Sequence, residues 1–327
     1  MAKILGIGNA LVDLLIRLED DYLLDELNLP KGSMTLVDDD TKTLINEKSI
    51  HLQKDMASGG SAANTIHGLA KLGADTAFIG SVGNDETGDF FYNDLQKSDI
   101  KPLLSRSQTP TGIASTLISK DGERTFGTYL GAAIELSGEK LSPQQFEGFD
   151  IMHVEGYLVQ NHDLLETILK YAKQAGSKIS VDMASFNVVE ANLAFFKDMV
   201  EKYVDIVFAN EEEAKSFTGK EPEEALDIIA QSTDIAVVKI GGRGSLVKTG
   251  DKVFTIDPIP VQVTDTTGAG DAYAAGFLFG MSNGLGYNNA GYIGSLLASI
   301  TIETTGARIK DERWEEILQK VAKLRKV

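Results

Sequence analysis

The stretch that could most clearly take part in a reaction is Asp265-Thr-Thr-Gly-Ala-Gly-Asp271. In it, three residues with almost no side chain precede a carboxylate. Before it, residues 261–264 alternate between apolar and polar and predict a short strand. After it, residues 272–280 are almost all apolar and predict a buried helix. The first N–H groups of that helix have no partner within it, and the small residues allow an anion to approach them.

Asp271 is the unexpected member of this stretch, because a carboxylate repels the anion that the turn would attract. One interpretation is structural: an acidic side chain in the first turn complements the helix dipole. The other is catalytic: Asp271 takes a proton from an attacking hydroxyl while the turn holds a phosphoryl group. Thr266 and Thr267 would add hydroxyl donors beside the turn.

The stretch resembles the C-terminal signature of the ribokinase family, the phosphofructokinase-B type of carbohydrate and nucleoside kinases. Because the motif is long and has a mechanism, it is more specific than a lone glycine triplet. The resemblance implies that the glycine turn is an anion hole and that the last Asp is the catalytic base. The implied catalytic residues are Gly268, Ala269, Gly270 and Asp271.

A second pattern begins at Gly59-Gly60, a turn that precedes a helix of small residues for which Ser61 is a plausible cap. With Asn64, it resembles the N-terminal signature of the same family. The resemblance implies that the substrate-binding glycines, Gly59 and Gly60, let the substrate approach the backbone and that Asn64 bonds a sugar hydroxyl. From the residues alone, Asn64 would more often be a packing or capping residue.

The first predicted strand, residues 3–8, ends in Gly6-Ile-Gly8, which resembles the start of a dinucleotide-binding turn. The third glycine of that fingerprint is replaced by Leu11 and no clear helix follows, so a dehydrogenase is disfavoured; NADH fluorescence would test it. Resemblance to the kinase family instead implies that Asn9 and Asp13 bind substrate hydroxyls. Spacing alone would make them local caps or turns.

Two later segments resemble the family's nucleotide site, which implies ATP and Mg²⁺. Asn210-Glu-Glu-Glu213 matches an Asn-x-x-Glu motif that organises magnesium in the family, and the resemblance favours that role. From the residues alone, an N-cap with acidic first-turn residues is the favoured interpretation. The glycine loop at residues 241–244 would flank the nucleotide. The implied cofactor-binding residues are Asn210, Lys239, Gly241, Gly242, Gly244 and Thr266, and the implied metal-binding residues are Glu213 and Asn210.

Three further segments complete the expected site. Thr305-Gly-Ala307 resembles a segment that lines the adenine and a monovalent-cation (potassium) site. Arg243 would face either phosphate or solvent. Arg124 would either reach a phosphate or, beside Glu123, form a solvated pair.

From residue 141 onward, short apolar strands alternate with helices, which indicates a mostly parallel sheet covered on both faces. The expected fold is a single α/β domain over residues 1–327, with three α/β/α layers and a small β-sheet lid. The lid would come from residues 12–37 and 108–130, where Asp121-Gly122 marks a hairpin turn. Polar residues at the strand ends, Asp182, Asn210, Gly241 and Asp265, would share one rim.

Composition limits the remaining possibilities. The 327 residues include 31 basic and 48 acidic side chains, a net charge of −17, which disfavours binding to nucleic acid. There is no cysteine, and no apolar run approaches the length of a membrane span, so a cytoplasmic protein that acts on a small molecule is expected. The family includes monomers and homodimers.

The expected reaction is transfer of the ATP γ-phosphoryl group to a primary hydroxyl of a nucleoside or sugar. Gly8-Asn-Ala-Leu-Val-Asp13 and Leu130-Gly-Ala-Ala133 resemble adenosine-kinase-type members, so adenosine is favoured. A free sugar such as ribose or fructose is the alternative. A nucleotide-binding regulator without turnover is disfavoured, because a pure binder does not need Asp271.

Overall fold

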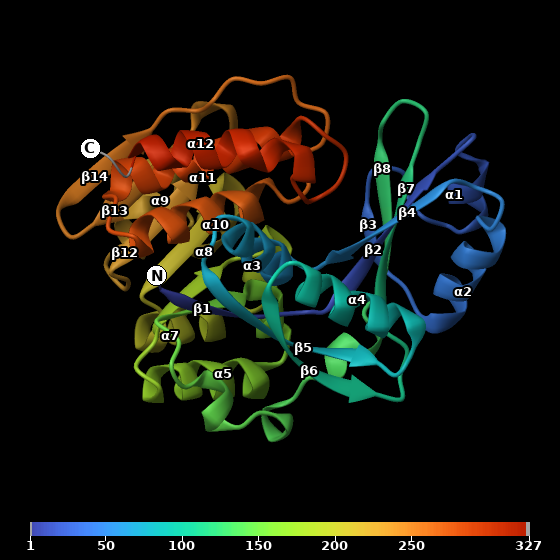
Figure 1. Cartoon of the computed structure of the whole chain (residues 1–327), viewed down its shortest axis with the longest axis horizontal. Helices are drawn as coiled ribbons and strands as arrows, with labels where there is room; N and C mark the ends of the chain where they lie inside the picture. The colour runs from blue at the N-terminus through green and yellow to red at the C-terminus, as the bar shows by residue number, and fades with distance from the viewer. Residues whose placement is uncertain (1, 325–327) are drawn as a thin grey trace.

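The computed structural model describes residues 2–324 and is built around a nine-stranded sheet of order β14-β13-β12-β11-β10-β9-β1-β5-β6 (Figure 1). Strands β1 to β12 of this sheet are parallel, and β13 and β14 add an antiparallel edge. Parallel strands are buried on both faces, which explains their continuous apolar runs. The strands are β1 (Lys3–Ile7), β5 (Asp75–Gly83), β6 (Ile100–Ser107), β9 (Ile151–Glu155), β10 (Lys178–Asp182), β11 (Ile206–Asn210), β12 (Ile235–Lys239), β13 (Ser245–Thr249) and β14 (Lys252–Ile256).

Helices cover both faces of this sheet and form a separate hydrophobic core on each, so the expected three-layer α/β/α fold is confirmed. One face carries α3 (Ser61–Lys71), α4 (Glu86–Lys97), α10 (Ala269–Ser282), α11 (Tyr287–Ile302) and α12 (Trp314–Leu324). The other carries α5 (His162–Gln174), α6 (Phe186–Ala191), α7 (Leu193–Tyr203), α8 (Glu211–Thr218) and α9 (Pro222–Ile229). Short 3₁₀ turns link them at Gly131–Glu135, Gly138–Lys140, Pro143–Phe146, Gly156–Gln160, Gly241–Arg243 and Asp311–Arg313.

A second, five-stranded sheet of order β3-β8-β7-β2-β4 stands beside this body (Figure 1). Its strands are β2 (Leu11–Arg17), β3 (Met34–Leu36), β4 (Lys54–Gly59), β7 (Gly112–Ile118) and β8 (Arg124–Tyr129). Helices α1 (Tyr22–Glu26) and α2 (Asp39–Lys48) pack on it around a small core of their own, which includes Leu14, Leu24, Ile45 and Leu117. The sheet therefore has the independent packing that a lid needs, and its closing motion stays a prediction.

Two local predictions are wrong. Residues 261–264 form no strand; instead the N–H groups of Thr264 and Asp265 donate to the carbonyl of Ile302 at the end of α11 (2.7 and 3.2 Å). The prolines that precede this segment lack the N–H groups that a strand would need. Ser61 is also not the cap of α3, which begins after Gly60.

Among residues 2–324, no helix is long and apolar enough to cross a membrane.

Candidate active site

The glycine turn before α10 is held in place by Asp265. One carboxylate oxygen of Asp265 accepts from the N–H and hydroxyl of Thr267 (3.1 and 2.8 Å), and the other accepts from the N–H of Gly306 (2.7 Å). Gly268, the N-cap, has φ +75°, and a Cβ there would lie 2.4 Å from the carbonyl oxygen of Ala307. Only glycine fits this backbone position, after which α10 begins with N–H groups that have no partner within the helix.

Asp271 lies in the first turn of α10 and faces α3. Its Oδ1 accepts from the hydroxyl of Ser61 (2.7 Å) and its Oδ2 accepts from the side-chain N–H of Asn64 (3.1 Å). Burial raises the pKa of Asp271 to about 6, and the charge of Asp182 acts in the same direction, against the two hydrogen bonds and Lys239. At pH 7 the carboxylate is thus mostly ionised and still basic enough to accept a proton.

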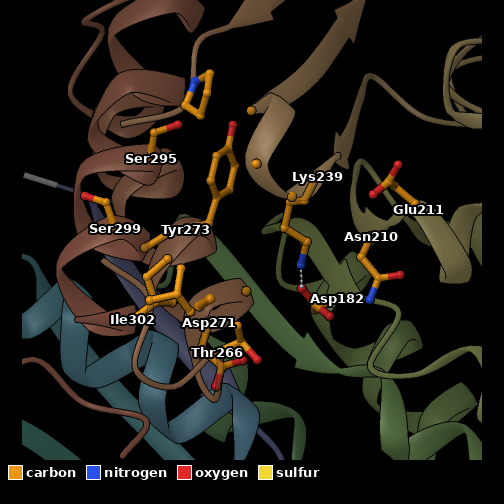
Figure 2. Close-up of a pocket in the computed structure, with 18 of the residues that line it drawn as sticks. Asp182, Asn210, Glu211, Lys239, Thr266, Asp271, Tyr273, Ser295, Ser299 and Ile302 are labelled. Atoms are coloured by element: carbon orange, nitrogen blue, oxygen red, sulfur yellow. Dashed lines mark hydrogen bonds and ion pairs between the residues drawn. The ribbon is translucent and has the colours of Figure 1, made fainter. Parts of the chain in front are cut away.

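Asp271 is also part of the wall between two cavities, together with Ser61 and Tyr157. The first cavity, of about 850 Å³, extends from the start of α10 along β11, β12 and α11. Figure 2 shows Lys239, Asn210 and Glu211 on one side of it, and Ser295 and Ser299 on the other. Predicted cofactor residues that line it are Asn210, Lys239, Gly241, Gly242, Gly244 and Thr266, along with Glu213, Ala269 and Gly270. The structure therefore brings the predicted nucleotide residues together.

A buried ion pair lies at the floor of this first cavity (Figure 2). The ammonium of Lys239 bonds the carboxylate of Asp182 at 2.9 Å, and a Cβ placed on Gly270 would be 2.9 Å from the same nitrogen. Burial alone would lower the pKa of Lys239, but the charges of Asp182 and Glu213 hold that pKa above its ordinary value. A cation is therefore fixed against the glycine turn, where an anion would be bound.

Asn210 and Glu213 form a complete capping box at the start of α8. Glu213 N–H donates to Asn210 Oδ1 (2.8 Å), and the Glu213 carboxylate accepts from the backbone and side-chain N–H groups of Asn210 (2.8 and 2.7 Å). Burial and the charge of Asp182 raise the pKa of Glu213. The structural interpretation of the motif is thus realised, while the metal-binding one stays a prediction.

The second cavity, of about 840 Å³, lies between the body and the second sheet. Predicted substrate residues that line it are Asn9, Asp13, Gly60 and Asn64. Its wall is mostly apolar and includes Leu11, Met34, Leu36, Ala114, Leu130, Ala133, Ile134 and Leu136. Gly59 and Gly268 are not among the residues that line either cavity; Gly59 instead packs against the carboxyl of Asp13.

Glu155, at the end of β9, is a buried acid on this side that the sequence analysis missed. Its carboxylate accepts from the side chain and backbone of Asn9 (2.6 and 3.3 Å) and from Ala62 N–H (3.2 Å), and burial raises its pKa to about 7. Asp13 is also buried, which raises its pKa to about 6 against the charges of Arg308 and Arg124. Glu155 is the last residue of a parallel strand, as Asp182 and Asn210 are, so its position was the available signal.

The prediction of a solvated Arg124–Glu123 pair is wrong. Arg124, on β8 of the second sheet, forms an ion pair with Asp265 (2.6 Å), and the exposed fractions of the two side chains are only 11% and 4%. The same guanidinium bonds the hydroxyl of Thr267 (3.3 Å). The second sheet is thus tied directly to the glycine turn. Arg243, by contrast, pairs with Glu211 at the surface.

The chain is similar to known kinases over most of its length. A family model described as pfkB family carbohydrate kinase matches residues 32–314. The chain is similar to a probable sugar kinase from Rhizobium etli CFN 42 (TM-score 0.88, 32% identity, 99% of each chain) and to adenosine kinase from Sinorhizobium meliloti (TM-score 0.87, 32% identity, 98% of this chain and 99% of that one). An uncharacterized sugar kinase of Archaeoglobus fulgidus is 28% identical over 244 residues, which cover 74% of this chain and 96% of its own length.

The family match covers most of the chain, and the two solved structures superimpose over nearly all of it. The chain belongs to the pfkB family of carbohydrate kinases and is an ATP-dependent carbohydrate or nucleoside kinase.

Proposed function

We propose that the protein transfers the γ-phosphoryl group of ATP to the primary hydroxyl of a nucleoside, with adenosine as the preferred acceptor. The observation that carries this proposal is the position of Asp271 in the wall shared by the two cavities. A base in that wall can take a proton from an acceptor on one side while the phosphoryl group arrives from the other. Holding both reactants there supplies the proximity on which phosphoryl transfer depends.

The size and lining of the second cavity favour a nucleoside over a free sugar. Asn9, Asp13 and Asn64 gather polar atoms at the Asp271 end, where a ribose would present its hydroxyls. The rest of the lining presents more apolar than polar surface and includes Met34 and Leu36, together with polar side chains such as Asn161 and Asn187. A sugar has no apolar surface to bury there, whereas a nucleobase does. The similarity to the adenosine kinase from Sinorhizobium meliloti supports the same choice.

In the proposed reaction, the acceptor hydroxyl attacks the γ-phosphorus and gives its proton to Asp271, as ADP leaves. The ionised Asp271 is kept in place by Ser61 and Asn64, which donate to its two oxygens. The N–H groups of the glycine turn and the ammonium of Lys239 face the charge that develops on the phosphoryl oxygens. These donors are fixed before the substrates arrive, so little reorganisation is required during transfer.

The side-chain oxygens that line the nucleotide cavity suit magnesium, which prefers oxygen ligands and keeps several waters. Among residues 2–324, no group of three or more His, Cys, Asp or Glu is placed to hold a metal unaided. Glu213 and Asn210, which line the nucleotide cavity, would hold Mg²⁺ together with waters and ATP oxygens. When bound, Mg²⁺ neutralises phosphate charge. The monovalent-cation site at residues 305–307 stays a prediction.

An ATP-consumption screen over purine and pyrimidine nucleosides, ribose and fructose tests the proposal. We expect the highest kcat/KM with adenosine and at least ten-fold lower values with free sugars, since a sugar forgoes burial of the base, which is worth more than about 1.4 kcal/mol. Phosphorylation of ribose or fructose with a higher kcat/KM would establish the sugar-kinase alternative, which the similarity to the Rhizobium etli protein favours. No turnover of any acceptor would favour a regulator.

A further inference from the structure

Arg308 connects the site to the protein interior, and neither cavity nor family signature singles it out. It lies in the segment after α11, and only 14% of its side chain is exposed. Its Nε donates to Asn64 Oδ1 on α3 (3.2 Å), and its Nη1 donates to Asp94 Oδ2 on α4 (2.7 Å). Asp94 also accepts from the hydroxyl of Ser58. The planar guanidinium is therefore held between two helices.

The contact with Asn64 has a directional consequence. An amide side chain has an acceptor oxygen and a donor NH₂, which exchange places when the group rotates by 180°. Arginine only donates and an ionised carboxylate only accepts. Between Arg308 and Asp271, Asn64 can therefore satisfy both neighbours in one orientation only, with its oxygen toward Arg308 and its NH₂ toward Asp271. That is the orientation in the structure.

We propose that Arg308 is a positioning residue for phosphoryl transfer: by holding the oxygen of Asn64, it keeps the NH₂ of Asn64 on the carboxylate of Asp271. This inference rests on the proposed function, since it concerns the base of that reaction. Without Arg308, Asn64 is free to turn its oxygen toward Asp271, which places two acceptors face to face. The ionised form of Asp271 would then lose a donor that favours it.

The other groups around Asp271 come from several elements, and Arg308 contacts none of them directly. Ser61 on α3 donates to the second oxygen, and Lys239 on β12 supplies a positive charge. The negative charges near Asp271 come from three elements: Asp182 on β10, Glu155 on β9 and Glu213 on α8. The effect of Arg308 on the base should therefore pass through Asn64. Its charge also lowers the pKa of Asp13 in the acceptor cavity, so the test must separate the two effects.

The test is the pH dependence of kcat for wild type, R308M and R308K with the best acceptor of the screen. At low pH the rate should fall as the base becomes protonated, and we call this part of the pH profile of kcat the acidic limb. In R308M we expect the midpoint of the acidic limb to lie about one pH unit higher than in wild type, the scale of a lost hydrogen bond to a charged group. The rate should fall about five-fold at pH 6 and recover by pH 8.5. R308K keeps the charge but not the two-pronged geometry, so it should restore only part of the shift.

Two further variants decide whether the effect is specific. R313M removes an equal charge from the same C-terminal segment, where Arg313 pairs with Glu303, and its acidic limb should match that of wild type. N64L and R308M/N64L should share one acidic limb, because the path through Asn64 is gone. A limb that still moves in R308M/N64L would assign the shift to the charge of Arg308 on Asp13 and would overturn the inference. A rate ratio of R308M to wild type that is constant with pH would overturn the inference, as would full restoration by R308K. If R308M does not fold, R308K decides: an unmoved limb overturns the inference.

The same series separates this inference from the proposed function. D271N is included, and it should lack the acidic limb altogether. A limb that persists in D271N means that another group is the base, and both proposals fall together. A limb that disappears in D271N but does not move in R308M leaves the proposed function standing and removes only the role of Arg308.

Discussion

Replacing Asp271 by Asn removes the base with little change of shape. In wild type the two oxygens accept one hydrogen bond each, from Ser61 and Asn64. An Asn can keep its oxygen toward Asn64 and turn its NH₂ toward Ser61, whose hydroxyl can accept as well as donate. No polar group is then left unpaired, so D271N should fold and bind ATP. We expect kcat to drop by ~10²–10⁴, the range for a positioned general base.

The same substitution should stabilise the protein at neutral pH. Burial raises the pKa of Asp271 from 3.8 to about 6, which means that the folded state binds the proton more tightly than the unfolded state does. Stability therefore falls as pH rises between these two values, by about 3 kcal/mol from this group. D271N cannot ionise and avoids that loss, so its free energy of unfolding at pH 8 should exceed that of wild type by up to about 3 kcal/mol.

Three measurements on D271N check both expectations: kcat with saturating ATP, ATP affinity by calorimetry, and urea unfolding at pH 4.5 and pH 8. D251N, at an exposed turn, is the matched control and should change none of them. The gain in stability should shrink to about 1 kcal/mol at pH 4.5, where Asp271 is protonated in the folded state but still mostly ionised in the unfolded state. A D271N enzyme with kcat within ten-fold of wild type, or one that is less stable at pH 8, would refute the assignment of Asp271 as a buried, ionised base.

The remaining predictions concern the groups around this base. E213Q should raise the magnesium concentration needed for half-maximal rate, and an unchanged magnesium titration would remove Glu213 from the metal site. G268A should lose ~1–3 kcal/mol and at least ten-fold in kcat, because an added Cβ would lie 2.4 Å from a carbonyl oxygen; G250A, also at positive φ but in open space, is the control. R124M should cost about 3 kcal/mol in urea unfolding by leaving Asp265 without its buried partner, and a loss below about 1 kcal/mol would contradict that role.

The fold could be predicted because its signals are local. The alternation of apolar strands and helices from residue 141 fixes the layers, and the parallel strands carry the apolar runs that burial on both faces requires. Three strands were not predicted, among them the short edge strand β14 (Lys252–Ile256). The other two were missed for different reasons. β4 (Lys54–Gly59) has no apolar pattern, whereas β6 (Ile100–Ser107) contains a proline that is tolerated only because the strand lies at the edge of the sheet.

The parts of the site that sequence missed depend on distant pairs. Arg124 was expected either to reach a phosphate or to pair with its neighbour Glu123, but folding brings it to Asp265, far along the chain. Ser61 was expected to cap its own helix, but it donates to Asp271 instead. Local rules predict local partners, and a buried arginine or serine takes whichever partner the folded interior provides. The residues of the glycine turn were easier to predict, because the conformation of a short turn is determined by neighbouring residues and not by distant partners.

An acidic chain that must bind a polyphosphate would be expected to keep carboxylates out of its phosphate site, yet this one buries several there. Asp182 is compensated: burial would raise its pKa, but Lys239 holds that pKa below its usual value. Asp271 is compensated only in part by Ser61, Asn64 and Lys239, and its pKa is raised toward neutrality. A protein selected only to bind ATP would gain affinity by replacing Asp271 with a neutral residue, and stability as well. The retention of a partly compensated, destabilising carboxylate beside the anion turn therefore favours turnover over a purely regulatory role, because only proton transfer requires it.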